Sequence, residues 1–194
     1  MKTFEILKSL LEKDRSIRRF EEQKEIGEDE LKEIVSLAAF CASARNAQPL
    51  KYRIVSEKEE REVLFPELSW AGYLTDWEGP SAGERPAAYI IQCLDTSLSS
   101  NCLCDDGLQL QAITLGAAAK NLGCCIIKSF NPVKITDLLE LPQGMKPLYV
   151  VAIGHQAEKV VIDWLTSGDD SIKYYRSADG VHHVPKRKPG DLII

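Results

Sequence analysis

Residues 105–130 read DDGLQLQAITLGAAAKNLGCCIIKSF, which combines the clearest helix of the chain with a strand that follows it. Apolar residues recur here at helical spacing, a pattern typical of a helix with one face in a core. The stripe consists of Leu108, Ala112, Leu115, Ala119 and Leu122. We therefore expect a helix over residues 105–122 that ends before Gly123, and a strand over residues 124–130.

Shorter elements are expected on both sides of this unit. Predicted helices cover residues 3–12, residues 28–41, a short stretch opened by a Ser56/Glu59 capping box, and a stretch that begins at Asn131-Pro132. Predicted strands cover residues 52–55, 87–94 and 148–153. The irregular alternation favours an α+β sandwich over a doubly wound sheet, and the length of 194 residues fits a single domain, 1–194.

Two segments have little regular pattern. Residues 65–86 contain two of the three tryptophans, are interrupted by proline and glycine, and are expected to form an ordered loop. The tail from Asp163 onward is polar and poor in core residues until residues 181–184 and 192–194. Such a tail needs a surface to lie on, and a partner subunit is one candidate.

Composition excludes several classes of protein. The net charge of -5 argues against a broad nucleic-acid surface. No apolar run reaches the roughly 18–20 residues that cross a bilayer. The N-terminal residues 1–5 are amphipathic and include an acid, unlike a signal or transit peptide, so a cytoplasmic location is expected.

The six cysteines do not have zinc-ligand spacing, and no histidine lies close enough in sequence to complete a set. They are Cys41, Cys93, Cys102, Cys104, Cys124 and Cys125. We expect reduced thiols that act as small apolar side chains, and no metal.

The common catalytic and nucleotide-binding motifs are absent. There is no G-x-G-x-x-G, G-x-x-x-x-G-K-[ST], G-x-S-x-G or H-E-x-x-H. The three histidines, His155, His182 and His183, have no neighbours that indicate a triad. This absence favours a bound cofactor as the group that carries the reaction.

Two polar segments are candidates for holding such a group. In residues 15–20, RSIRRF, guanidinium groups and a hydroxyl can surround a phosphate, while Phe20 anchors the segment; the alternative is a surface turn between helices. Residues 43–49, SARNAQP, offer a hydroxyl and two carboxamides that suit the edge of a heterocycle; the alternative is an ordinary turn. A second basic cluster, residues 186–188, would also suit a small anion, although from charge alone two solvated surface patches are the better explanation.

Together these segments resemble the nitroreductase family of FMN-dependent enzymes. The family pattern is R-S-x-R-x-F, then P-S-x-x-N-x-Q-P, then D…G…A…L-G along a long helix, then a basic K-R near the C-terminus. This chain has the corresponding residues at 15–20, 42–49, 106–123 and 182–187, in that order. The resemblance spans essentially the whole chain.

The resemblance implies a central, mostly antiparallel sheet flanked by helices, and a homodimer whose C-terminal tails are exchanged. It also implies roles for individual residues toward FMN. Arg15, Ser16 and Arg18 would hold the phosphate and the pyrimidine side, and Arg18 would stabilise the reduced flavin. The other implied contacts are Ser43, Asn46 and Gln48 along the isoalloxazine, the backbone of Ile127, Lys128 and Ser129 at N5 and O4, and Lys186 and Arg187 at the phosphate.

The chain also departs from the family pattern. Asp14 stands where a basic residue is common, Ala42 replaces a proline, and Leu50 replaces an aromatic residue. The aromatic residues of the 65–86 loop, Trp70, Tyr73 and Trp77, would either cover the flavin or only pack the loop down.

The function implied by the resemblance is electron transfer from NADH or NADPH to a small oxidised acceptor, such as a nitroaromatic or a quinone, by a ping-pong mechanism. Two alternatives stay open: a flavin-binding or sensing module without turnover, and specialised flavin chemistry such as reductive dehalogenation. The expected partners are a second copy of the chain and small molecules, without nucleic acid or membrane.

Overall fold

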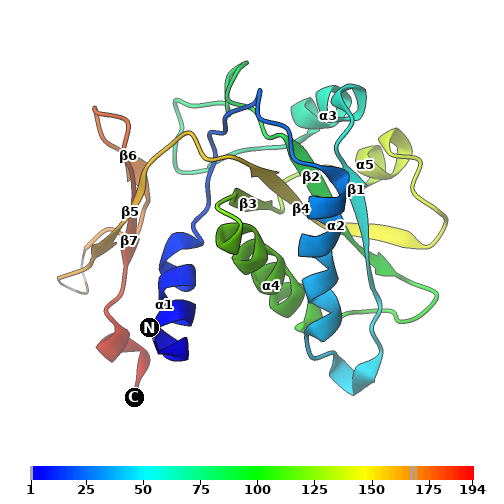
Figure 1. The fold of residues 1–194 in the computed structure, drawn as a ribbon, viewed down its shortest axis with the longest axis horizontal. Helices are drawn as coiled ribbons and strands as arrows, with labels where there is room; N and C mark the ends of the chain where they lie inside the picture. The colour runs from blue at the N-terminus through cyan, green and yellow to red at the C-terminus, as the bar shows by residue number, and fades with distance from the viewer. Residues whose placement is uncertain (1, 167, 169) are drawn as a thin grey trace.

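The structure is a computed structural model that describes residues 2–166, 168 and 170–194; residues 1, 167 and 169, two of them in the predicted tail, lie outside the described part. A four-stranded antiparallel sheet with the strand order β1-β2-β4-β3 forms the centre (Figure 1). Its strands are β1 (Leu50–Val55), β2 (Ala88–Asp95), β3 (Gly123–Ile127) and β4 (Met145–Gly154). The expected α+β class and the mostly antiparallel central sheet are therefore confirmed.

Five α-helices and four short 3-10 helices accompany the sheet in the described part of the chain. The α-helices are α1 (Thr3–Lys13), α2 (Glu28–Ser36), α3 (Lys58–Leu64), α4 (Asp105–Ala119) and α5 (Pro132–Leu138). The 3-10 helices are η1 (Leu37–Phe40), η2 (Ala44–Asn46), η3 (Phe65–Glu67) and η4 (Pro189–Leu192).

The helices cover both faces of the sheet because β2 and β4 are apolar on both faces. All eight residues of β2 are buried. Alternate residues of a strand point to opposite faces. Tyr89 and Ile91 accordingly join a core that includes residues of α3 and α5, whereas Ala88 and Ile90 join a core that includes residues of α2 and α4. Burial on both faces explains why β2 is apolar without alternation.

Three details of the predicted helices are wrong. The core face of the long helix is formed by Leu110, Ile113 and Ala117, not by the predicted stripe, of which Leu108 is 46% exposed. The long helix ends at Ala119 instead of residue 122, because Asn121 adopts a left-handed φ of 61° and Gly123 is already the first residue of β3. The predicted capping box of Ser56 and Glu59 does not form, since α3 begins without a side-chain cap among the described residues. The other predicted elements are present with shifted ends.

The C-terminal tail forms a second sheet, which lies apart from the central sheet on the side of α1 (Figure 1). Its strands are β5 (Val160–Trp164), β6 (Tyr175–Arg176) and β7 (His182–Lys186), and β5 pairs with β7 in parallel. His182 is fully buried and contacts Arg18 of its own chain. The chain itself therefore supplies part of the surface that the tail needs, and exchange of tails between two copies stays a prediction.

Candidate functional site

The segment of residues 15–20 crosses one end of the central sheet over a pair of glycines. Gly123 of β3 and Gly154 of β4 are partners in the sheet. A Cβ on Gly123 would lie 2.7 Å from Ile17, and a Cβ on Gly154 would lie 2.9 Å from Phe20. The missing side chains therefore make room for the segment, and Phe20, fully buried, anchors it as expected.

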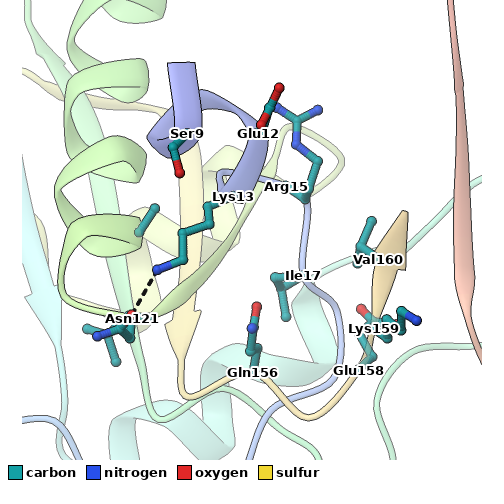
Figure 2. Close-up of a pocket in the computed structure, with 12 residues that line it drawn as sticks. Ser9, Glu12, Lys13, Arg15, Ile17, Asn121, Gln156, Glu158, Lys159 and Val160 are labelled. Carbon is teal, nitrogen blue, oxygen red and sulfur yellow. Dashed lines mark hydrogen bonds between the residues drawn. The ribbon is translucent and has the colours of Figure 1, made fainter. Parts of the chain in front are cut away.

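A cleft of about 480 Å³ opens beside this segment, between the end of α1, the end of α4 and the residues that follow β4 (Figure 2). Its lining residues are Ser9, Glu12, Lys13, Arg15, Ile17, Ala118, Asn121, Leu122, Gln156, Glu158, Lys159 and Val160. Three of them are cationic and two are carboxylates, so the cleft favours a small anion over a cation.

Arg15 is half-buried in this cleft and keeps hydrogen-bonding capacity. Its Nη2 donates to the carbonyl oxygen of Leu11 at 2.7 Å. Its Nε is buried and has no hydrogen-bond partner among the described residues. The neighbouring Ser16 is exposed. A guanidinium in the cleft next to an exposed hydroxyl suits a phosphate group.

Arg18 points elsewhere, toward the tail. Arg18 is only 9% exposed, and its guanidinium lies over the ring of Tyr174 at 4.8 Å, with Nη1 3.1 Å from Nε2 of His182. Its backbone N–H donates to the carboxylate of Glu158. The structure thus joins Arg15 and Arg18 in one segment, but Arg18 is not among the residues that line the cleft.

The imidazole of His182 is uncharged at neutral pH where it contacts Arg18. Burial, followed by the nearby charge of Arg18, lowers the pKa of His182 to about 4, although Glu158 opposes this change. Glu158 is itself held by Arg176, whose Nη2 lies 2.8 Å from its Oε2. The Arg18 guanidinium is therefore next to an uncharged imidazole at neutral pH.

The aromatic residues of the 65–86 loop make packing contacts within the chain. Trp70 is only 8% exposed and joins the core that includes Phe20. Tyr73 packs against Tyr174 with ring centroids 4.9 Å apart, and Arg176 lies 4.8 Å over the Trp77 ring. The loop is therefore packed down onto the core and onto the tail.

The second predicted segment forms a tight polar loop between α2 and β1. The Oγ of Ser43 donates to Oδ2 of Asp105 at 2.6 Å and accepts from the backbone N–H of Gln48 at 2.8 Å. The side chains of Asn46 and Gln48 are exposed and joined by a hydrogen bond of 3.1 Å. Arg45, Asn46 and Gln48 all have left-handed φ values, of 55°, 55° and 48°. Such strain in non-glycine residues is concentrated at functional sites.

The two predicted segments lie at opposite ends of α4. Ser43 is bonded to the first residue of this helix, whereas Ser16 pairs with Cys124, which lies beyond its last residue. A helix of 15 residues is about 22 Å long. One copy of the chain therefore does not bring Arg15 together with the polar loop.

The remaining predicted contacts are dispersed. Ile127 is buried at the end of β3, the Nζ of Lys128 donates to a carbonyl oxygen of β4, and the carbonyl oxygen of Ser129 accepts from Ser69. Lys186 ends β7, and Arg187 lines a separate cleft of about 190 Å³. Neither Lys186 nor Arg187 lines the cleft of Arg15.

Sequence reasoning missed three polar residues of the site. Lys13 and Lys159 line the cleft, and Asp105 holds the polar loop. Lys159 belongs to a polar run directly after a buried strand, which was a usable signal. For Asp105 the sequence offered two adjacent aspartates, and the resemblance drew attention to Asp106 instead.

Two other kinds of site are absent from the described residues. None of the helices there is long and apolar enough to span a bilayer. No three residues among the His, Cys, Asp and Glu of that part of the chain come together as a metal-binding group.

The model of the nitroreductase family matches residues 11–89 and 104–155, more than half of the chain. Three solved structures share the fold. A nitroreductase family protein from Streptococcus pneumoniae is 17% identical, with a TM-score of 0.67 over 84% of this chain and 96% of that one. A nitroreductase family protein from Clostridium novyi is 23% identical, with a TM-score of 0.63 over 80% and 87%. The NADPH:FMN oxidoreductase from Vibrio harveyi, complexed with NAD+, is 22% identical, with a TM-score of 0.61 over 77% and 68%. The chain belongs to the nitroreductase family.

Proposed function

We propose that residues 1–194 form one FMN-binding domain of an oxidoreductase that passes electrons from NADH or NADPH to a small oxidised acceptor, such as a nitroaromatic or a quinone. FMN would be held between two copies of the chain. The observation that carries the proposal is the placement of the two polar segments at opposite ends of α4, a helix about 22 Å long. A similar fold in the NADPH:FMN oxidoreductase from Vibrio harveyi supports the choice of cofactor.

A second copy is also suggested by apolar surface on α1. Every residue of this helix is at least partly exposed. Phe4, Leu7 and Leu11 are 70%, 48% and 40% exposed. Contiguous apolar side chains on an amphipathic helix mark an interaction surface. A homodimer would cover this surface and bring the polar loop of one copy to the Arg15 cleft of the other.

The residues present fit FMN at its two ends. Arg15 and Ser16 would bind the phosphate, and Lys13 and Lys159 would add positive potential around it. Ser43, Asn46 and Gln48 of the second copy would hydrogen-bond the isoalloxazine edge. The backbone of residues 127–129 would lie near N5 and O4, and Lys186 and Arg187 would reach the phosphate from the tail.

The hydride chemistry itself is supplied by FMN when it is bound. The chain contributes binding, orientation and electrostatics. Negative charge develops on the pyrimidine side of a reduced flavin, and a preorganised cation there is worth several kcal/mol as an order of magnitude. Arg18 is the proposed cation, and to reach the flavin its guanidinium would have to leave its contacts with Tyr174 and His182. Its partner His182 is neutral at neutral pH, because its pKa is lowered to about 4, so this contact does not cancel the positive charge.

An absorbance spectrum of the purified protein, followed by anaerobic titration with NADH and with NADPH, tests the proposal. We expect a flavin spectrum that bleaches with at least one of the two donors and returns when a quinone or a nitroaromatic is added. A flavin spectrum that no nicotinamide bleaches would replace the oxidoreductase with a flavin-binding module. A colourless protein that does not take up added FMN would contradict the cofactor.

A further inference from the structure

The carboxylate of Asp105 accepts the hydrogen bonds that hold the polar loop, residues 43–49, to α4. Asp105 is the first residue of α4 and only 1% exposed. Its Oδ2 accepts from the Oγ of Ser43 at 2.6 Å, and its Oδ1 accepts from the backbone N–H of Ala44 at 2.9 Å. Both oxygens therefore point at the loop.

The hydrogen bonds extend from Asp105 across the loop. Because its proton is donated to Asp105, the Oγ of Ser43 presents lone pairs to the backbone N–H of Gln48, which donates to it at 2.8 Å. Asp105 thus restrains both ends of the turn that contains Arg45, Asn46 and Gln48 with their left-handed φ values of 55°, 55° and 48°. Left-handed conformations of residues other than glycine persist only where surrounding contacts hold them.

We propose that Asp105 is a positioning residue for the flavin: it holds the polar loop in the conformation that presents Asn46 and Gln48 to the FMN bound at Arg15 of the other copy. This inference rests on the proposed function. Asp105 acts through Ser43 and Ala44 and does not touch the flavin itself. Because α4 separates this loop from Arg15 of the same chain, the effect of Asp105 crosses the dimer interface.

Asp106 provides a matched control. It is the next residue of α4, but its carboxylate accepts from the neighbouring backbone N–H of Gly107, and among the described residues the loop donates to Asp105 instead. Asp105→Asn and Asp106→Asn make the same chemical change one residue apart. The amide of Asp105→Asn retains one acceptor oxygen where the loop needs two.

The test is titration of the apoprotein with FMN, in which binding is monitored through the quenching of flavin fluorescence. The proteins compared are the wild type, Asp105→Asn, Asp106→Asn, Ser43→Ala and the double variant Ser43→Ala/Asp105→Asn. We expect Asp105→Asn to raise the Kd of FMN about tenfold, which equals the roughly 1.4 kcal/mol of one hydrogen bond. Asp106→Asn is expected to change the Kd less than about twofold on the same scale. The effect of the double variant is expected to be smaller than the two single effects combined, because Ser43 and Asp105 share one hydrogen bond, whereas the bond from Ala44 involves Asp105 alone.

The reduction potential of the saturated variants separates positioning from simple destabilisation. A displaced loop changes the hydrogen bonds to the isoalloxazine, so the potential of Asp105→Asn should shift, whereas loss of fold stability alone would leave it unchanged. Equal Kd values of FMN for Asp105→Asn and Asp106→Asn, or an unchanged reduction potential in Asp105→Asn, would overturn the inference. The proposed function would still stand in that case, provided that the wild type binds FMN.

A measurement on the wild type keeps the inference testable if Asp105→Asn does not fold or if FMN does not bind. The backbone N–H of Ala44 and of Gln48 should exchange slowly with solvent in the apoprotein, since both donate within the network. Fast exchange at Ala44 would show that Asp105 does not hold the loop.

Discussion

The Nε2 of His182 lies 3.1 Å from the Nη1 of Arg18, so a buried imidazole of the tail meets a buried guanidinium from the segment that crosses the sheet. The contact joins residues 164 positions apart. It needs a neutral imidazole, because a protonated ring would have no lone pair for Arg18 and would repel it.

The first prediction concerns the pH dependence of stability. The pKa of His182 falls from 6.5 to about 4 on folding, through burial and the charge of Arg18, with Arg176 and His183 acting in the same direction and Glu158 opposing them. The folded state therefore binds this proton less readily than the unfolded state. The contribution of His182 to the free energy of unfolding is fully present above pH 6.5, decreases as the pH falls toward 4, and amounts to about 3 kcal/mol in all.

Urea unfolding at a series of pH values measures this contribution. Between pH 6.5 and 4 the free energy of unfolding should fall less steeply in His182→Gln than in the wild type, with His155→Gln as the control. Parallel curves for wild type and His182→Gln would contradict this role of the histidine.

Removal of the Arg18 side chain is expected to lower the FMN content. Arg18→Ala loses the proposed cation on the pyrimidine side and also the contacts with Tyr174 and His182, so proteolysis of the tail should become faster. Arg18→Lys keeps the charge and should retain more FMN. Flavin content per chain and the rate of tail cleavage measure the two effects. Unchanged flavin in purified Arg18→Ala would refute its placement against the cofactor.

Arg15 and Arg19 form a matched pair for the phosphate contact. Arg15 lines the cleft, whereas Arg19 does not line it and forms an ion pair with Glu84 at 3.5 Å. Arg15→Gln should weaken FMN binding by roughly tenfold or more, as expected for a lost charge-assisted hydrogen bond, and should reduce its salt dependence. Arg19→Gln should change the affinity little. Riboflavin lacks the phosphate, so its affinity should be similar in all three proteins; a large loss of riboflavin binding in Arg15→Gln would argue against a phosphate contact.

Gly154→Ala tests whether the segment of residues 15–20 needs a glycine beneath it in the sheet. The added methyl group would lie 2.9 Å from the Phe20 ring, and overpacking of this kind costs about 1–3 kcal/mol. We expect a lower unfolding free energy and weaker FMN binding, because residues 15–20 must shift. Gly107→Ala is the control, since an added Cβ there has no described atom within 4 Å. Equal stability of the two variants would mean that the segment moves away without cost.

The positions of most central strands and helices could be predicted because their apolar runs are local, but the buried face of α4 was assigned wrongly, since Leu108 is exposed and Leu110 is buried. The sequence could not predict the second sheet, whose short strands pair residues such as Val160 and His182 that lie far apart along the chain. The position of Arg18 depends on that pairing and was missed for the same reason. Asp105 and Asp106 look alike in a sequence, and only the phase of α4 decides which carboxylate faces the loop. The separation of Arg15 from Ser43 needed the orientation of α4 in space.

The central claim, that one FMN lies between two copies, is tested most directly with mixed dimers. Arg15→Ala and Asn46→Ala chains carry different tags, are co-expressed, and the mixed dimer is isolated through both tags. If each site combines Arg15 of one copy with Asn46 of the other, the mixed dimer has one intact site and one doubly altered site. We predict about half of the wild-type flavin content in the mixed dimer, and much less in either variant homodimer. A mixed dimer with as little flavin as the two homodimers would place both residues of a site in one chain and contradict the account.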